Sequence, residues 1–94
     1  MVSRKIVIQS PSGLHLRPAG LLCKEAMKFK SRIIFQSKGT TVNVKSVLSV
    51  LGAGIKGGSE IELICDGEDE REALEILIGI IKSGLGECTR HIRQ

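Results

Sequence analysis

The sequence predicts an α+β domain in which helices cover one face of a mainly antiparallel sheet. The first observation is the order of the patterns, because strand-like and helical segments follow one another as βαββαβα. The second is a hairpin, since Lys38-Gly39 separates two strand-like runs and is typical of a two-residue turn. The third is the alternation of apolar and polar residues, which is expected where an antiparallel sheet has one buried face.

The expected strands are short, and several are rich in β-branched residues. Ile6 and Ile8 share one face of the first strand, and Ile33 and Phe35 share one face of the second. These alternating positions predict which side of the sheet is buried. The expected strands cover about 4–9, 32–37, 40–44 and 60–65.

The expected helices have different start signals. The first, at about 16–29, has one apolar face formed by Ala19, Leu22, Cys23 and Ala26. The second, at about 46–51, begins after the N-cap residue Ser46 and stops at the glycines that follow. The third opens at about 68 with acidic residues, which complement the positive end of a helix.

Composition places the chain among small cytoplasmic proteins. Its 94 residues allow one domain with a modest core, and 41% hydrophobic residues are enough to fill it. The three cysteines are an odd number and far apart, which favours reduced thiols over a disulfide framework. We expect neither a signal peptide nor a membrane span, since no apolar run approaches about 20 residues.

Charge is unevenly distributed along the chain. Residues 1–58 carry ten Lys or Arg and one acid, whereas residues 59–94 carry four basic and nine acidic residues. Two interpretations remain open: ordinary solvated faces, or a basic face that steers the approach of acidic partners. Nucleic-acid binding is not expected, because the chain has two Phe and no Trp or Tyr for stacking on bases.

The stretch Gly13-Leu14-His15-Leu16-Arg17-Pro18-Ala19 lies where the first strand hands over to the first helix. His15 falls at or beside the N-cap, where unpaired N–H groups and the helix dipole attract anions. Arg17 adds a guanidinium suited to phosphate oxygens. A histidine in this setting suggests a carrier of a phosphoryl group, although a lone histidine could equally cap a helix or lie unused on the surface.

This motif resembles the active site of HPr, the histidine-containing phosphocarrier of the bacterial phosphoenolpyruvate:sugar phosphotransferase system. The segment 41–51 resembles the family's regulatory serine region, and 82–87 resembles its usual end. The resemblance covers 1–87, our expected phosphocarrier domain, and leaves 88–94 as a tail expected to be disordered. It implies an open-faced β-sandwich with a four-stranded sheet and three helices on one face.

The resemblance also implies a role for individual residues. His15 would accept a phosphoryl group from phosphorylated enzyme I and pass it to a sugar-specific enzyme IIA. Arg17 and the backbone of Leu16 and Arg17 would stabilise the phosphate. The chain would be a stoichiometric carrier rather than an enzyme, with no cofactor and no metal. Leu16 and Gly20 depart from the family's usual small residue and usual Ala, Ser or Thr.

Two further assignments follow from the resemblance, each beside a purely structural interpretation. Ser46 would be phosphorylated by an HPr kinase/phosphorylase, although its N-cap role alone would explain it. Part of an apolar set would dock enzyme I and enzyme IIA, although core packing alone would also explain these residues: Leu21, Val47, Leu48 and Leu51.

Several alternatives remain at this stage. The chain could be a regulatory relative, for example of a nitrogen-type branch, that acts mainly through phosphorylation-dependent protein binding. The resemblance also implies a carbon-catabolite transcription regulator as a partner. We expect a monomer. The segment 52–57 matches G-x-G-x-x-G but follows a helix, the reverse of a dinucleotide-binding turn. Cys88 and His91 are too few ligands for a structural zinc.

Overall fold

A computed structural model confirms the predicted α+β class and the βαββαβα order. The structure describes residues 1–8, 13 and 16–82, so residues 9–12, 14–15 and 83–94 lie outside the described part. The expected C-terminal tail falls in that outside part. The elements are β1 (Val2–Val7), α1 (Leu16–Ala26), β2 (Arg32–Ser37), β3 (Thr40–Asn43), α2 (Val47–Gly52), β4 (Glu60–Asp66) and α3 (Glu70–Lys82).

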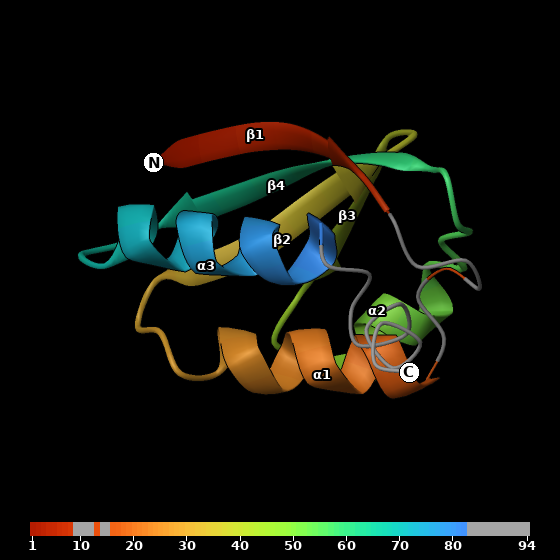
Figure 1. Ribbon diagram of the computed structural model, residues 1–94, viewed down its shortest axis with the longest axis horizontal. Coiled ribbons are helices and arrows are strands. Elements are labelled where there is room, and N and C mark those ends of the chain that lie inside the picture. Colours follow the sequence, from red (N-terminus) through yellow and green to blue (C-terminus); the bar gives the residue numbers. More distant parts are fainter. Residues whose placement is uncertain (9–12, 14–15, 83–94) are drawn as a thin grey trace, which may run out of the picture.

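The sheet is antiparallel throughout and has the strand order β1-β4-β2-β3. Figure 1 shows its strands along the top of the molecule and the three helices below them, so none of the described helices covers the opposite face of the sheet. The hairpin at Lys38-Gly39 is confirmed, because Ser37 pairs with Thr40 directly across it. This is the one-sided layer architecture that the sequence predicts.

The core lies between the sheet and the helices. Phe35 and its cross-strand neighbours Leu63 and Val42 are almost fully buried. The outward positions of the same strands, such as Gln36 and Glu62, are at least partly exposed. Because one aromatic ring fills so little of the core, aliphatic side chains supply the rest: Ile8, Leu22, Ile33, Ile61, Leu77, Ile81, Val44 and Val50 are buried.

Three elements differ by two residues or more from the sequence-based expectation. The first strand occupies Val2–Val7, two residues earlier than predicted, yet Ile6 and Ile8 are both buried as expected. The first helix ends at Ala26, because Phe29 N–H donates to the Ala26 carbonyl over 3.2 Å in a tighter i→i+3 turn. The third helix begins at Glu70 rather than at about 68.

The late start of α3 has a specific cause at Asp69. The Asp69 carbonyl accepts from Ala73 N–H over 2.9 Å, which is the N-cap pattern. Its carboxylate, however, accepts from the backbone N–H of Lys30 over 2.8 Å and of Ser31 over 2.9 Å, as well as from the Ser31 hydroxyl. Asp69 thus ties the start of α3 to the turn between α1 and β2.

Candidate functional site

The approach to α1 is fixed at Gly13, which is buried and has a φ of +74°. A Cβ atom there would lie 2.3 Å from the Ile55 carbonyl oxygen and 2.7 Å from Lys56 Cα. Both contacts are with backbone, which cannot move aside without shifting the loop. Gly13 therefore presses the chain entering α1 against the loop between α2 and β4, and only glycine fits.

The first turn of α1 carries an uncompensated positive end. Arg17 is exposed, Pro18 is buried, and no acidic residue lies in this turn. By contrast, the first turn of α3 contains Glu70 and Glu72, which neutralise its dipole in the ordinary way. A cation at an N-terminus is unfavourable unless an anion joins it, so this end of α1 is suited to an external anion.

The expected phosphoryl acceptor, His15, lies outside the described residues, and the structure therefore does not test it. Of Leu16, the described part is the backbone, which begins α1. The N–H groups of Leu16 and Arg17 belong to the first turn of a helix, where N–H groups have no intrahelical acceptor. Arg17 forms no ion pair with a described residue.

The N-cap role of Ser46 is confirmed. Its backbone is extended, and its hydroxyl oxygen accepts from Ser49 N–H over 3.2 Å. Two further contacts that the sequence analysis missed hold this turn: the Ser49 hydroxyl accepts from Asn43 N–H over 3.2 Å, and Asn43 Oδ1 accepts from Lys45 N–H over 3.0 Å. The sequence did offer a signal for these contacts, because Asn and Ser side chains often accept hydrogen bonds from nearby backbone N–H groups, as Asn43 and Ser49 do here.

Lys45 joins the two helices rather than standing free in solvent. Its ammonium donates to the Phe29 carbonyl over 2.7 Å, just beyond the end of α1. The Cys23 thiol of α1 in turn donates to the Lys45 carbonyl over 3.2 Å, and Cys23 is half-buried rather than in the core as expected. Lys45 therefore fixes the entry to α2 against α1. Its positive charge interacts with a carbonyl near the negative end of a helix.

The predicted docking residues divide into two groups. Leu48 is 78% exposed and points away from the core. Leu21, Val47 and Leu51 are only half-buried, and the last two also pack against the core. The structural interpretation thus explains Val47 and Leu51 in part, whereas nothing in the core explains Leu48. A role in docking stays a prediction for all four residues. The three on α2, Val47, Leu48 and Leu51, are called here the α2 patch.

Two other sequence patterns add no site within the described residues. The G-x-G-x-x-G match runs from the last residue of α2 into the loop before β4, so its context is indeed the reverse of a dinucleotide-binding turn. Among the described residues, no three metal-ligating side chains come together, and Cys88 and His91 lie outside them. No helix in the described part is long and apolar enough to cross a membrane.

Comparison with known proteins gives consistent matches. A family model described as "PTS HPr component phosphorylation site" matches residues 2–83. The HPr-like protein Crh of Halalkalibacterium halodurans is 40% identical over 82 residues, covering 87% of this chain and 98% of that protein. The phosphocarrier protein HPr of Buchnera aphidicola is 43% identical over 77 residues, covering 82% of this chain and 91% of that protein.

Solved structures agree with the sequence matches. HPr from Thermoanaerobacter tengcongensis superposes with a TM-score of 0.89 at 37% identity, covering 93% of this chain and 98% of that one. Crh from Bacillus subtilis, described as a dimer with a swapping domain, has a TM-score of 0.72 at 37% identity, covering 89% of this chain and 97% of that one. The residues matched by the family model run from β1 to α3.

Proposed function

The chain belongs to the HPr family of phosphocarriers of the phosphotransferase system, and on that premise we propose that His15 carries the phosphoryl group. His15 accepts the phosphoryl group from phosphorylated enzyme I and passes it to a sugar-specific enzyme IIA for sugar uptake. The observation that carries the proposal is the uncompensated positive end of α1, where Arg17 is exposed and no acid balances it.

The chemistry needs a carrier that holds phosphate without trapping it. In the first transfer, the bond between phosphorus and enzyme I breaks as a bond between phosphorus and a ring nitrogen of His15 forms. On delivery, this phosphorus–nitrogen bond breaks as phosphorus bonds to enzyme IIA. The N–H groups of Leu16 and Arg17 and the Arg17 guanidinium stabilise the charge on the phosphoryl oxygens. Positioning and charge neutralisation supply most of the catalysis in phosphoryl transfer.

The direct test incubates the protein with phosphoenolpyruvate and a bacterial enzyme I. The expected product is a phosphoprotein that is labile to acid and stable to base, as a phosphoramidate is. His15→Ala abolishes it, and Arg17→Gln slows its formation. The matched control is Lys24→Gln, which removes another exposed charge from α1. Full labelling of His15→Ala would rule the proposal out.

Regulation at Ser46 is a second part of the proposal. Ser46 is half-buried at the start of α2, next to the exposed Leu48. A phosphate there adds about −1.5 to −2 charge at a helix N-terminus, which stabilises the helix while repelling an acidic partner. Incubation with ATP and HPr kinase/phosphorylase tests it: an acid-stable phosphate is expected, and none in Ser46→Ala. No incorporation into the wild-type chain would refute regulation by this route.

The resemblance to Crh favours one alternative, a regulatory relative that binds a target protein according to its phosphorylation state. The target would be a carbon-catabolite transcription regulator or a protein of a nitrogen-type branch. The two functions differ in the second transfer. A protein that is labelled by enzyme I and then passes the label to enzyme IIA is the sugar carrier, whereas a label retained in the presence of enzyme IIA supports the regulatory role.

We also propose that the protein acts as a monomer in the cytoplasm. Two similar solved structures, Crh from Bacillus subtilis and an HPr from Thermoanaerobacter tengcongensis, are described as dimers, so this assignment needs its own test. Light scattering during gel filtration distinguishes the monomer mass of 10.2 kDa from twice that value. A stable species at the doubled mass would replace the monomer with a dimer.

A further inference from the structure

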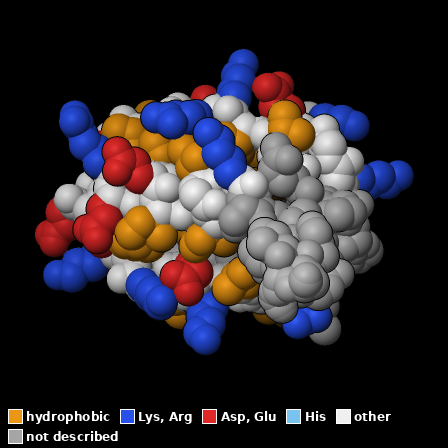
Figure 2. All heavy atoms as spheres, viewed as in Figure 1, with side chains coloured by type: hydrophobic (Ala, Val, Ile, Leu, Met, Phe, Trp, Pro, Cys, Tyr) orange, Lys and Arg blue, Asp and Glu red, His pale blue; other side chains and the backbone are white. Residues whose placement is uncertain are grey.

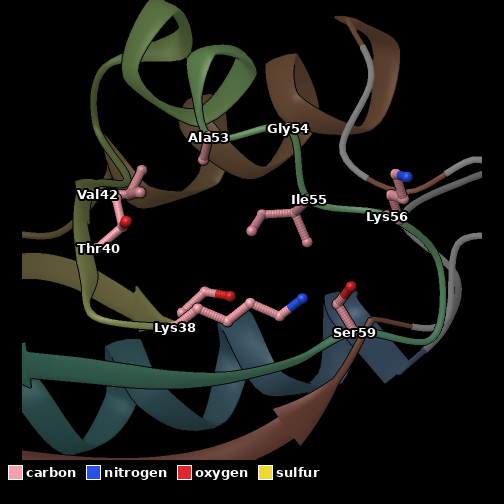
Figure 3. A pocket seen from close by; sticks show the side chains of 9 residues that line it. Lys38, Thr40, Val42, Ala53, Gly54, Ile55, Lys56 and Ser59 are labelled. Atoms are coloured by element: carbon pink, nitrogen blue, oxygen red, sulfur yellow. The ribbon is translucent and has the colours of Figure 1, made fainter.

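A cavity of about 260 Å³ lies between the β2–β3 hairpin and the loop that joins α2 to β4. None of the residues predicted for phosphoryl transfer or docking lines it. Its walls come from segments far apart in the sequence, which the fold brings together (Figure 3). The lining residues are Ser37, Lys38, Thr40, Val42, Ala53, Gly54, Ile55, Lys56 and Ser59.

The polar part of this lining is chemically one-sided. It contains two lysines and three hydroxyl side chains, but no acidic residue. In Figure 3, Lys38 extends along one wall toward Ser59, and Lys56 stands on the opposite rim. Neither lysine forms an ion pair with a described residue. Within this lining the ammonium and hydroxyl donors meet no carboxylate, and such donors match the oxygens of a phosphate. Glu60 and Glu62 line a neighbouring hollow, which Lys38 also borders.

The remaining wall is apolar. Ile55 projects into the cavity in Figure 3, opposite Lys38, and Val42 and Ala53 also line it. This mixture of a few polar groups and an apolar wall is usual for small-molecule sites. The volume is slightly below the range of roughly 300–1,000 Å³ that is usual for such sites, so the compound must be small.

Lys38 has an unusual backbone for its residue type. Its φ of +50° is the only positive value among described residues other than glycine, and Gly39 follows with +82°. A hairpin turn with two positive φ values normally takes Asn-Gly or Gly-Gly, because a longer side chain is disfavoured there. A strained residue whose side chain faces a cavity is a reason to look for a function of that side chain.

We propose that this cavity binds a small phosphorylated compound. The Lys38 ammonium and the hydroxyl groups of Ser37 and Ser59 contact the phosphate, while Ile55 and Ala53 contact the organic part. Lys56 contributes positive potential at the rim. The inference is independent of phosphoryl transfer by His15, because it uses a different set of residues.

The test is a titration of ¹⁵N-labelled protein followed by amide chemical shifts, at constant ionic strength. The probes are inorganic phosphate and glycerol 3-phosphate, with glycerol as the neutral control and acetate as the carboxylate control. Saturable shifts are expected at 38–40 and 54–59, and glycerol 3-phosphate is expected to bind more tightly than phosphate. Shifts near Arg17 report the other anion site, and Arg17→Gln removes those alone.

Lys38→Asn is the decisive variant, because asparagine suits the turn better than lysine. We expect its melting temperature to equal or exceed that of the wild type, while phosphate binds the cavity about tenfold more weakly for loss of a charge-assisted hydrogen bond. Lys24→Gln is the matched control and should bind normally. Unchanged affinity in Lys38→Asn, equal weakening in Lys24→Gln, equal shifts with glycerol or acetate, or shifts that do not saturate would each overturn the proposal.

Discussion

Gly13 illustrates how one hydrogen atom in place of a methyl group positions the candidate phosphate site. Its φ of +74° and its backbone contacts with Ile55 and Lys56 leave no room for a side chain. Only two residues separate it from the first residue of α1. A displacement at Gly13 therefore reaches the first turn directly, and with it the N–H groups proposed to hold phosphate.

Gly13→Ala is expected to lower the free energy of unfolding by more than the roughly 1–2 kcal/mol that a left-handed conformation alone requires. The excess comes from overlap with the Ile55 carbonyl. Urea denaturation measures it, and Gly39→Ala isolates the conformational part, since Gly39 has φ +82° but nothing within 4 Å of its Cβ position. Phosphorylation by enzyme I should also slow in Gly13→Ala and not in Gly39→Ala. Equal destabilisation of both variants would contradict the steric argument.

Asp69 makes the stability of the fold depend on pH through a single carboxyl group. Hydrogen bonds from the Ser31 hydroxyl and from the Lys30 and Ser31 N–H groups lower the pKa of Asp69 to about 2, against 3.8 ordinarily. A carboxyl whose pKa is depressed in the folded state contributes stability above its unfolded pKa and loses it as pH falls toward the folded pKa. The contribution of Asp69 is therefore complete above about pH 4 and vanishes toward pH 2.

Asp69→Asn tests this linkage by thermal unfolding at several pH values. The variant should be less stable than the wild type at pH 7, because an amide oxygen accepts these hydrogen bonds less strongly than a carboxylate. The difference should shrink as the pH falls below about 4 toward the folded-state pKa of about 2, because Asp69 is then protonated in the unfolded and finally in the folded wild type. Glu68→Gln is a suitable control, since Glu68 is exposed and pairs only loosely with Lys30, at 3.6 Å. A difference independent of pH would show that the carboxylate charge is not the cause.

At the scale of elements, α2 is a short helix that is held at its start and exposed along one side. Ser46 caps its start, and Lys45 fixes its entry to the end of α1. Val50 of the same helix is buried, so α2 has a packed side, and Leu48 faces outward. An exposed leucine on a rigidly fixed helix is the arrangement that a docking surface requires.

Leu48→Glu is expected to slow phosphoryl transfer from enzyme I at least tenfold while changing stability by less than about 0.5 kcal/mol, as for other exposed positions. The reason is that the apolar contact with the partner is lost, whereas no core contact is. Transfer kinetics and urea denaturation measure the two effects. Ile76→Glu on α3 is the matched control, because Ile76 is also exposed but belongs to another helix. Normal transfer by Leu48→Glu would remove Leu48 from the α2 patch.

At the scale of the whole molecule, local patterns predicted the fold, and distant contacts account for what they missed. Alternation identified both faces of β2, because a strand's side-chain period follows from its own residues. The start of α3 could not be predicted, because Asp69 accepts hydrogen bonds from Lys30 and Ser31, which lie 39 and 38 positions earlier in the chain. The partner of Lys45 was missed likewise, since Phe29 is 16 residues distant.

The candidate site shows the same division. The sequence motif located Arg17 and the cap at Ser46, because both depend on local helix starts. It could not show that Gly13 lies against the loop at 55–57, or that a cavity opens beside that loop. His15 itself remains a prediction of the motif. Local chemistry was therefore predictable, and its three-dimensional support was not.

Charge, too, is arranged differently in space from how it is arranged in sequence. The acidic half supplies β4, which lies between two strands from the basic half, so Lys5 stands opposite Glu62 and Arg32 opposite Asp66. The basic half still supplies α1, whose surface has no compensating acid at its start. Figure 2 shows Asp and Glu gathered mainly at the left, where α3 begins in Figure 1.

The positive start of α1 should therefore still attract an acidic partner although charges alternate across the sheet. The dependence of the transfer rate on salt concentration tests this attraction. The rate of phosphoryl transfer from an acidic enzyme I should fall severalfold between about 0.05 and 0.5 M salt, because the screening length shortens from more than ~10 Å to a few Å. Arg17→Gln should weaken the dependence, whereas Arg32→Gln should not, since Arg32 lies opposite Asp66 in the sheet. If the rate did not change with salt, the basic residues would be ordinary solvated charges, and docking would depend on the apolar contact of Leu48 alone.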